Sequence, residues 1–381
     1  MMGCFRLYLA MSVVFMHSSN LFGFRGVVGQ FAVQSFFVVS GFYMAMVLDT
    51  KYLASGVVNF YINRILRLFP LYILVWLVSL AGLLFFGRTQ YSTIDDFLRL
   101  PADGGLLATI FIGASNIFLL GQDLTCFFSV QNGGIVLQQT DHLAVLLQLV
   151  PQTWSVSLEL YFYALAPWLA RQPTRRILLA AAAFVGLRVL LALSGVSSDL
   201  WEYRFFPTAL PFFLGGMLSY RCYRAISAAK FLPAASTTIT AAWFFLIVTY
   251  DAWADLANGS ALFLGLKHWF PAIIPSDLLL PLVPLVVPFL FARAKSSAID
   301  RFIGELSYPI YLIHFFIIFV VRQLFGWSEI TNTQEAVILL AVLALSACAY
   351  ILVDRPLEAV RHGISSRSFQ KVVFASAEKS I

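Results

Sequence analysis

Residues 337–353, Val-Ile-Leu-Leu-Ala-Val-Leu-Ala-Leu-Ser-Ala-Cys-Ala-Tyr-Ile-Leu-Val, carry no charged side chain and are long enough to approach a crossing of the bilayer core. Residues 178–193 form a second such run, interrupted only by Arg188. The whole chain has this character, because 60% of its 381 residues are hydrophobic, 12% are charged and the mean hydropathy is +0.84. An ordinary soluble domain carries about twice as many charged residues. The sequence therefore predicts a protein whose solvent is the lipid bilayer.

Hydropathy predicts ten membrane spans and no internal repeat or soluble extension. The short, Gly-rich stretch 105–121 is expected to be re-entrant or interfacial, because counting it as a span would reverse the orientation of every later segment across the membrane. We therefore expect an all-α, polytopic transmembrane helical bundle that forms a single membrane domain over residues 1–381. The ten predicted spans lie near residues 5–23, 31–48, 68–87, 153–170, 177–194, 205–220, 233–250, 272–292, 303–322 and 334–353.

Positive charge predicts the orientation, because cytoplasmic loops carry an excess of Lys and Arg. With 105–121 left out of the count, one side receives 18 of the 25 Lys and Arg residues, including the basic tail over 357–381. Both termini are then cytoplasmic, in a multi-pass protein of the inner (plasma) membrane. The tail is expected to rest on anionic lipid. Charge scattered in this way gives no continuous basic face, so nucleic acid is not an expected partner.

Two ionisable residues mark the first predicted span. Arg6 and His17 are eleven residues apart, just over three helical turns, so both project from nearly the same face about 16 Å apart along the axis. Ionisable groups at membrane depth are costly and usually face a protein interior or a wet cavity. His17 is therefore a functional candidate, although a neutral His bonded to a neighbouring helix explains it equally well.

A second basic pair precedes the third predicted span. Arg64 and Arg67 lie one turn apart in the segment Phe60-Tyr-Ile-Asn-Arg-Ile-Leu-Arg-Leu-Phe-Pro70. Two fixed guanidinium groups suit phosphate, while topogenic charge is the simpler alternative. Pro70 is expected near the start of the span, where its missing N–H costs least.

Glu159 is the acidic candidate inside a predicted span, with Ser155 four residues before it on the same face. A buried carboxylate needs a partner. Glu159 could orient His17, bind a sugar, or form a structural ion pair with Arg188 or Arg204.

The ninth predicted span carries a polar and aromatic stripe. Ser307, Tyr311 and His314 share a helix face through their 4-then-3 spacing, and Tyr308 flanks them. The stripe could bind substrate or simply pack against neighbouring helices.

Three further polar residues, Asp123, Asp141 and His142, are expected to be ordinary solvated side chains of an outward-facing loop.

Several short segments follow one another in a fixed order along the chain. They are Arg6-x10-His17, Phe36-Phe-Val-Val-Ser-Gly-Phe42, Arg64-x-x-Arg67-x-x-Pro70, Trp154-Ser-Val-Ser-Leu-Glu159, Phe212–Gly216, Ser307-Tyr-x-x-Tyr-x-x-His314 and the closing Asp354-Arg-Pro356. In this order the segments resemble the motifs of the acyltransferase 3 family of integral membrane acyltransferases. Two departures from the usual pattern occur, since Gln34 stands where many members carry Asp and Leu160 follows Glu159 where many carry a second acidic residue.

The resemblance implies an enzyme that moves an acyl group, commonly acetyl, from cytoplasmic acyl-CoA to a hydroxyl of a cell-surface polysaccharide or lipid-linked saccharide. Arg6, Arg64 and Arg67 would then hold the phosphates of acyl-CoA. His17 would act as general base or as an acyl-histidine relay, with Glu159 as a second catalytic residue. The expected supporting side chains are Ser40, Trp154, Ser307, Tyr308, Tyr311 and His314.

Two other functions stay open at this level. A transporter or flippase could line a substrate path with the same ionisable residues, and the same apparatus could N-acylate an amino sugar. Acyl-CoA is expected as a co-substrate with no permanently bound cofactor, and the expected partners are membrane lipid and a saccharide acceptor. No metal is expected, because no H-x-x-x-H or H-x-x-x-D run occurs. The acyl group, the saccharide and the oligomeric state are left open.

Overall fold

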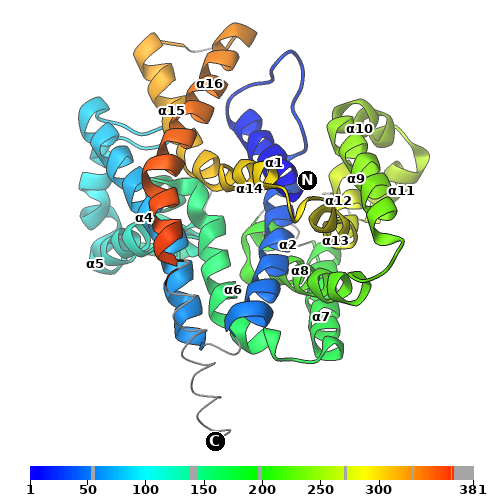
Figure 1. Ribbon diagram of the computed structural model, residues 1–381. Helices are drawn as coiled ribbons and strands as arrows, with labels where there is room; N and C mark the ends of the chain where they lie inside the picture. The colour runs from blue at the N-terminus through cyan, green and yellow to red at the C-terminus, as the bar shows by residue number, and fades with distance from the viewer. Residues whose placement is uncertain are drawn as a thin grey trace, which may run out of the picture.

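Long apolar helices dominate the computed structural model (Figure 1), which describes all residues except 53–55, 132, 138–143, 196–199, 270–272, 328–329, 362 and 364–381. The helices are α1 Met2–His17, α2 Gly29–Val47, α4 Val57–Phe86, α5 Ile94–Phe118, α6 Trp154–Ala170, α7 Thr174–Leu193, α8 Phe206–Ile226, α9 Leu232–Val248, α10 Tyr250–Asn258, α11 Ala261–Trp269, α12 Pro275–Leu279, α13 Val283–Ala294, α14 Ala298–Glu305, α15 Ser307–Phe325 and α16 Asn332–Ala349. Strands β1 Phe128–Gln131 and β2 Gly134–Leu137 pair as an antiparallel hairpin in the loop between α5 and α6.

The predicted all-α polytopic bundle is confirmed, and each predicted span overlaps a helix. Among the described residues, seven segments are long and apolar enough to cross a bilayer, and an eighth if α9 and α10, bent by 66°, form one span. Helix α1 has 16 residues and α6 has 17, so each measures about 25 Å, which is less than the hydrocarbon core. The seven segments are 29–52, 57–86, 94–118, 174–193, 275–294, 298–325 and 332–361.

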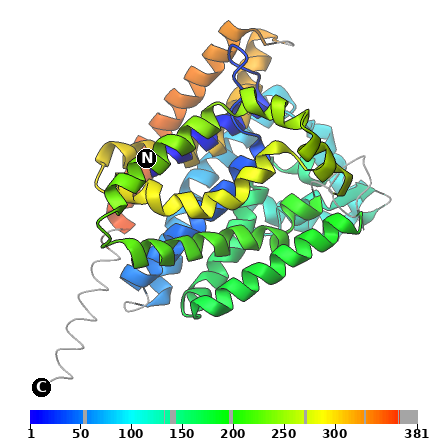
Figure 2. The ribbon, with the colours of Figure 1, turned by 90° about the vertical axis from the view of Figure 1, so that its right-hand side faces the viewer.

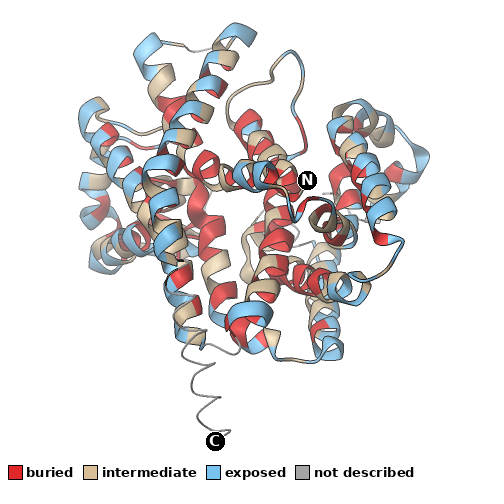
Figure 3. Cartoon of the chain, viewed as in Figure 1, coloured by how far each residue is buried: buried red, intermediate tan, exposed pale blue. Residues whose placement is uncertain are grey.

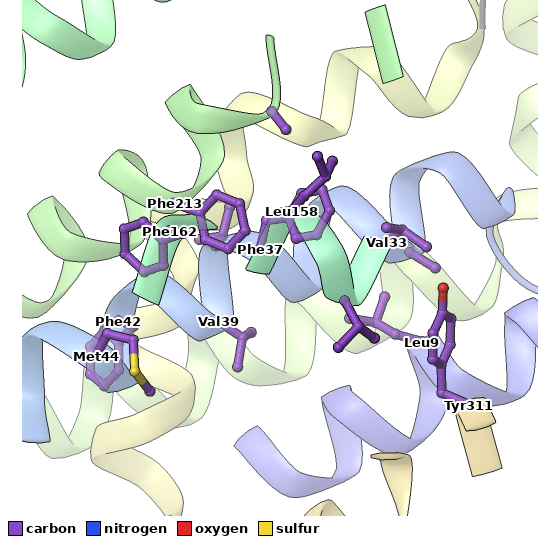
Figure 4. Close-up of a cluster of buried hydrophobic side chains, with 14 of the residues drawn as sticks. Leu9, Val33, Phe37, Val39, Phe42, Met44, Leu158, Phe162, Phe213 and Tyr311 are labelled. Atoms are coloured by element: carbon purple, nitrogen blue, oxygen red, sulfur yellow. The ribbon is translucent and has the colours of Figure 1, made fainter. Parts of the chain in front are cut away.

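The centre of the bundle is the crossing of α2 and α8. A Cβ atom on Gly41 would lie 2.0 Å from the carbonyl oxygen of Phe213, and one on Gly216 would lie 1.9 Å from that of Val38. Only glycine permits this approach, the means by which membrane helices pack closely. Beside the crossing, the ring of Phe213 stacks between the rings of Phe37 and Phe162, at 4.6 and 4.4 Å (Figure 4).

Helix α1 begins beside α14, near the middle of the view in Figure 1. Its first N–H groups have no partner within the helix and need acceptors from elsewhere. The carboxylate of Asp300 on α14 supplies them, accepting from the backbone N–H of Gly3 at 2.8 Å and of Cys4 at 3.1 Å. Gly3 and Gly304 let the two helices touch. The crossing of α14 over α1 thus fixes where the face that carries Arg6 points.

The outer helices expose apolar surface. Figure 3 shows the buried residues gathered on the inner helices, whereas the apolar window of α7 is only 6% buried. In Figure 2, α7 lies along α8, which separates it from α2. Exposed apolar residues on a protein of this composition are the expected lipid-facing surface.

Two local predictions need correction. Helix α4 starts at Val57, eleven residues before the predicted span, so Pro70 lies inside a continuous helix and not near its start. The stretch 105–121 is not a separate short segment, because most of it forms the second half of α5, which begins at Ile94 behind a capping box of Thr93 and Asp96. Gly105, with φ of 70°, kinks this helix.

Candidate active site

A cavity of about 550 Å³ lies among α1, α2, α4, α6, α14 and α15. It collects side chains from segments that are far apart in the sequence, from Met2 near the start of the chain to Arg361 near its end. The predicted site residues that line it are Arg6, Ser40, Arg64, Arg67, Glu159, Ser307, Tyr308 and Tyr311. His17, Trp154 and His314 are not among its lining residues.

An ion network holds two of the three arginines. Arg67 lies 2.6 Å from a carboxylate oxygen of Glu305 and 3.7 Å from one of Asp354, and Arg6 lies 3.9 Å from Glu305. The guanidinium of Arg67 also sits over the ring of Tyr308, at 5.8 Å. Glu305 ends α14, so the helix that caps α1 also brings the shared counter-ion to both arginines.

Arg64 has a different environment. Its guanidinium lies 5.9 Å from the ring centres of both Phe60 and Tyr163, and its Nη1 lies 3.9 Å from the sulfur of Met44. Within the described part of the chain it forms no ion pair. A guanidinium held by aromatic rings inside a cavity keeps its donors available for an anionic ligand.

Glu159 faces the cavity and not His17. Its carboxylate accepts hydrogen bonds from Ser40 and Tyr163, both at 2.5 Å. Among the described residues, no hydrogen bond or ion pair joins Glu159 to His17, Arg188 or Arg204. Glu159 therefore pairs with neither arginine in this structure, and it does not orient His17 through a hydrogen bond.

The two arginines have other partners. Arg188 donates to the backbone carbonyls of Glu202 and Thr208. Arg204 lies over the ring of Trp154, at 4.8 Å, and this tryptophan packs edge-on against Tyr203. Trp154 therefore belongs to an aromatic cluster next to the cavity.

Hydroxyl groups close the inner end of the cavity. The hydroxyl of Tyr311 lies 2.7 Å from that of Ser155 and donates to the backbone carbonyl of Gln152 at 2.7 Å. Tyr308 donates to the carbonyl of Leu68 at 2.8 Å, and Ser307 donates to the carbonyl of Gly304 on α14 at 2.7 Å. These bonds fix the stripe of α15 that the spacing placed on one face.

His17 and His314 lie beyond this closed end. Their ring centres are 5.5 Å apart, and the ring of Phe315 contacts both, at 4.3 Å from His17 and 4.7 Å from His314. His314 is fully buried, whereas His17 is half-buried at the last residue of α1. Tyr311, whose ring centre is 6.0 Å from that of His314, joins the cavity to the histidine pair.

A family model described as an acyltransferase domain matches residues 2–353. The chain belongs to the acyltransferase 3 family. Neither the curated proteins nor the solved structures give a match to it. The matched range contains every predicted site residue, so the cavity and the histidine pair are features of a membrane acyltransferase.

The loop between α5 and α6 of the acyltransferase corrects one prediction. Asp123 is not a solvated loop residue, because it is 3% exposed and accepts hydrogen bonds from Ser157 at 2.8 Å and Tyr161 at 2.9 Å. Burial raises the pKa of this carboxyl, while the two hydrogen bonds act in the opposite direction. Asp141 and His142 lie outside the described residues, as does most of the tail 357–381.

Sequence reasoning missed three side chains of the acyltransferase site. Tyr163 stands four residues after Glu159, and this spacing on one helix was a usable signal. Glu305 and Asp300 had no local signal, because their partners come from the first and third helices. Among the described residues, no group of three His, Cys, Asp or Glu side chains is arranged to hold a metal ion.

Proposed function

We propose that this acyltransferase moves an acyl group, with acetyl as the expected one, from cytoplasmic acyl-CoA to a hydroxyl of a cell-surface polysaccharide or lipid-linked saccharide. The observation that supports it most is the cavity, which joins three arginines to the hydroxyl-lined end beside the histidine pair. A long donor with an anionic head and a thin reactive arm matches this distribution of charge.

The cationic lining supports a nucleotide-bearing donor. Besides the three arginines, the cavity wall carries four more cations, and all seven belong to the side predicted to be cytoplasmic. The phosphates of coenzyme A would be held by Arg64 and Arg67, since paired guanidinium groups bind phosphate oxygens well. The four additional cations are Lys51, Lys295, Arg301 and Arg361.

The uncharged inner end would receive the thioester. Attack on its carbonyl places negative charge on the oxygen, which a fixed hydroxyl or cation stabilises. His17 would take the proton of the acceptor hydroxyl, because imidazole is the side chain best suited to this step near neutral pH. A C–O bond then forms as the C–S bond breaks, and the proton ends on the thiolate of coenzyme A.

An acyl-histidine relay is the second mechanism for the same reaction. His17 would first attack the thioester and then pass the acyl group to the acceptor. Incubating the protein with donor alone and searching for acylated His17 by mass spectrometry separates the two. Absence of the adduct under single-turnover conditions would exclude the relay.

The test is thioester consumption by the purified full chain with candidate saccharides. His17→Ala should lower turnover by about 10²–10⁴-fold, the usual contribution of a general base. His268→Ala is the matched control, since this histidine is exposed on α11, and it should behave as the wild type. Turnover by His17→Ala at the wild-type rate would sink the mechanism.

Arg6→Ala tests the donor site separately. It should raise the Michaelis constant for acyl-CoA and leave that for the saccharide unchanged, because Arg6 lines the cavity. An equal effect on both constants would remove Arg6 from donor binding.

A further inference from the structure

The imidazole of His314 has one satisfied and one unsatisfied nitrogen. Its Nδ1 lies 2.8 Å from the carbonyl oxygen of Tyr311 and 3.3 Å from that of Ile310. A carbonyl oxygen only accepts, so Nδ1 carries the hydrogen and Nε2 carries the lone pair. Within the described residues Nε2 has no hydrogen-bond partner, although the side chain is fully buried.

A buried acceptor without a partner is rare and needs an explanation. His17 stands beside it, with ring centres 5.5 Å apart and ring planes inclined by 31°. Two imidazoles joined edge to edge by one N–H···N bond have centres about 5 Å apart. At the observed separation, rotation of the two rings about their side-chain torsions brings one nitrogen of each ring within hydrogen-bond distance, and Phe315 contacts both rings.

We propose that His314 is the positioning residue of His17. Its Nε2 accepts a hydrogen bond from one ring N–H of His17, which fixes the tautomer of His17 and leaves the other nitrogen with its lone pair. This inference rests on the proposed function, in which that free nitrogen takes the proton of the acceptor hydroxyl.

The same bond strengthens as the reaction proceeds. When His17 gains the proton it becomes an imidazolium, whose N–H groups are better donors. His314 keeps its own hydrogen on Nδ1 throughout, because the carbonyl of Tyr311 holds it there. No proton passes through His314, and the proton leaves His17 for the thiolate of coenzyme A.

The rival explanation is that His314 only fills space. Its position next to Phe315 and Tyr311 would then suit an apolar side chain of similar size. His314→Gln and His314→Leu distinguish the two roles. An amide places an oxygen where Nε2 stands and an N–H₂ group toward the carbonyl of Tyr311, whereas leucine supplies packing alone.

Steady-state kinetics of the purified full chain give the first measurement. His314→Leu should lower kcat by about 100-fold or more, as expected when a catalytic His loses its tautomer partner. His314→Gln should recover at least tenfold of that loss. The Michaelis constant for acyl-CoA should not change in either variant, because His314 does not line the cavity. Phe319→Leu is the packing control, because it removes a buried ring from the same helix where it contacts Phe86. The kcat of this variant should equal that of the wild type.

The second measurement needs no acceptor. Diethyl pyrocarbonate acylates the lone pair of neutral imidazole, and mass spectrometry follows its reaction at His17 with His268 as internal reference. Carbethoxylation of His17 should be several-fold slower in His314→Leu than in the wild type and in His314→Gln.

Two outcomes would overturn the inference. One is wild-type kcat in His314→Leu. The other is equal loss in the leucine and glutamine variants with unchanged reactivity of His17, which would assign His314 a packing role. If the wild type consumes no thioester with any saccharide, the proposed function fails, and the reactivity of His17 still decides the role of His314.

Discussion

At the scale of single residues, Glu305 sets the charge balance of the arginine-lined cavity, the proposed donor site. Its carboxylate is shared by Arg67 and Arg6, and the three side chains are 21%, 12% and 16% exposed. Guanidinium groups buried to this degree need a counter-ion, and Glu305 provides it when no donor is bound. The phosphates of a bound donor would compete for the same groups.

Glu305→Gln should therefore lower the stability of the protein without ligand and increase the stabilisation that coenzyme A produces. We expect a lower melting temperature in detergent, with a loss of stability below the ~3–5 kcal/mol measured for fully buried ion pairs, because Asp354 still faces Arg67. Coenzyme A should raise the melting temperature of this variant more than that of the wild type. Asp255→Asn, an exposed carboxylate on α10, is the control and should change neither value. A smaller shift with coenzyme A in Glu305→Gln would contradict the competition.

Arg6, Arg64 and Arg67 could be found in the sequence, because charge inside an apolar chain is conspicuous, and all three line the cavity. The sequence could not assign the partner of Glu159, since Ser40 reaches this carboxylate across 119 residues and only the packing of α2 on α6 brings the two together. The family resemblance assigned Arg6 to the phosphates of acyl-CoA and His17 to the catalytic step, and the two share one face of the first predicted span. The tertiary structure separates them, because His17 stands behind Tyr311 and outside the cavity.

At the scale of elements, the crossing of α2 and α8 is the contact that tolerates least change. Ser40 on α2 holds Glu159, and it precedes Gly41, which touches the backbone of Phe213. Separating these helices would therefore move a cavity wall as well as the core. Membrane helices gain little from apolar burial between them, so close contact at small residues carries the association.

Gly216→Ala should weaken this crossing. The added methyl group would lie 1.9 Å from the carbonyl oxygen of Val38 and 2.7 Å from the nitrogen of Phe42, so the backbones must separate. A loss of about 1–3 kcal/mol is typical of overpacking, and thermal melting in detergent would measure it. Gly186→Ala on α7 is the control, because nothing lies within 4 Å of its Cβ position and alanine favours the helix. Equal melting temperatures for both variants would show that the crossing adjusts without cost.

Helix boundaries were predictable where hydropathy and helix ends coincide. The predicted start of α4 was wrong, because Asn59, Asn63, Arg64 and Arg67 lower the hydropathy of its first turns and only the apolar part that follows stands out. The predicted start of α5 was wrong for the same reason, since Asp95 and Asp96 lie in its first turn and Gly105 kinks the helix without ending it. Tertiary contacts, such as the hydrogen bond from Tyr72 to the carbonyl of Asn116, hold α5 against α4.

At the scale of the whole molecule, the two candidate substrate sites face opposite ends of the bundle. In Figure 1 the C-terminal end of α2 lies toward the lower edge, and the loop that follows α1 lies toward the upper edge. The arginine-lined cavity belongs to the first end and His17 to the second. The proposed reaction requires this division, because its donor is cytoplasmic and its acceptor is not.

Cysteine labelling should establish the orientation and the path of α5 together. We expect a membrane-impermeant maleimide to label Ser19→Cys and Ser260→Cys in intact cells, and Ser227→Cys only after permeabilisation, in a background with Cys222 and Cys348 replaced by Ser. Six crossings separate Ser19 from Ser260 when α5 does not cross the membrane and the bent pair α9 and α10 forms one span, so the two positions share a side. The six crossings are α2, α4, α6, α7, α8 and the pair α9–α10.

A crossing by α5 would be the seventh between Ser19 and Ser260 and would place them on opposite sides. Labelling of only one of the two in intact cells would therefore contradict the predicted topology, while labelling of Ser227→Cys alone would invert it. Either result would also change the side of the membrane on which the cavity is expected to open. With an inverted chain, the four cations that join the arginines there would face away from cytoplasmic acyl-CoA, and the donor would have to enter from the side of His17.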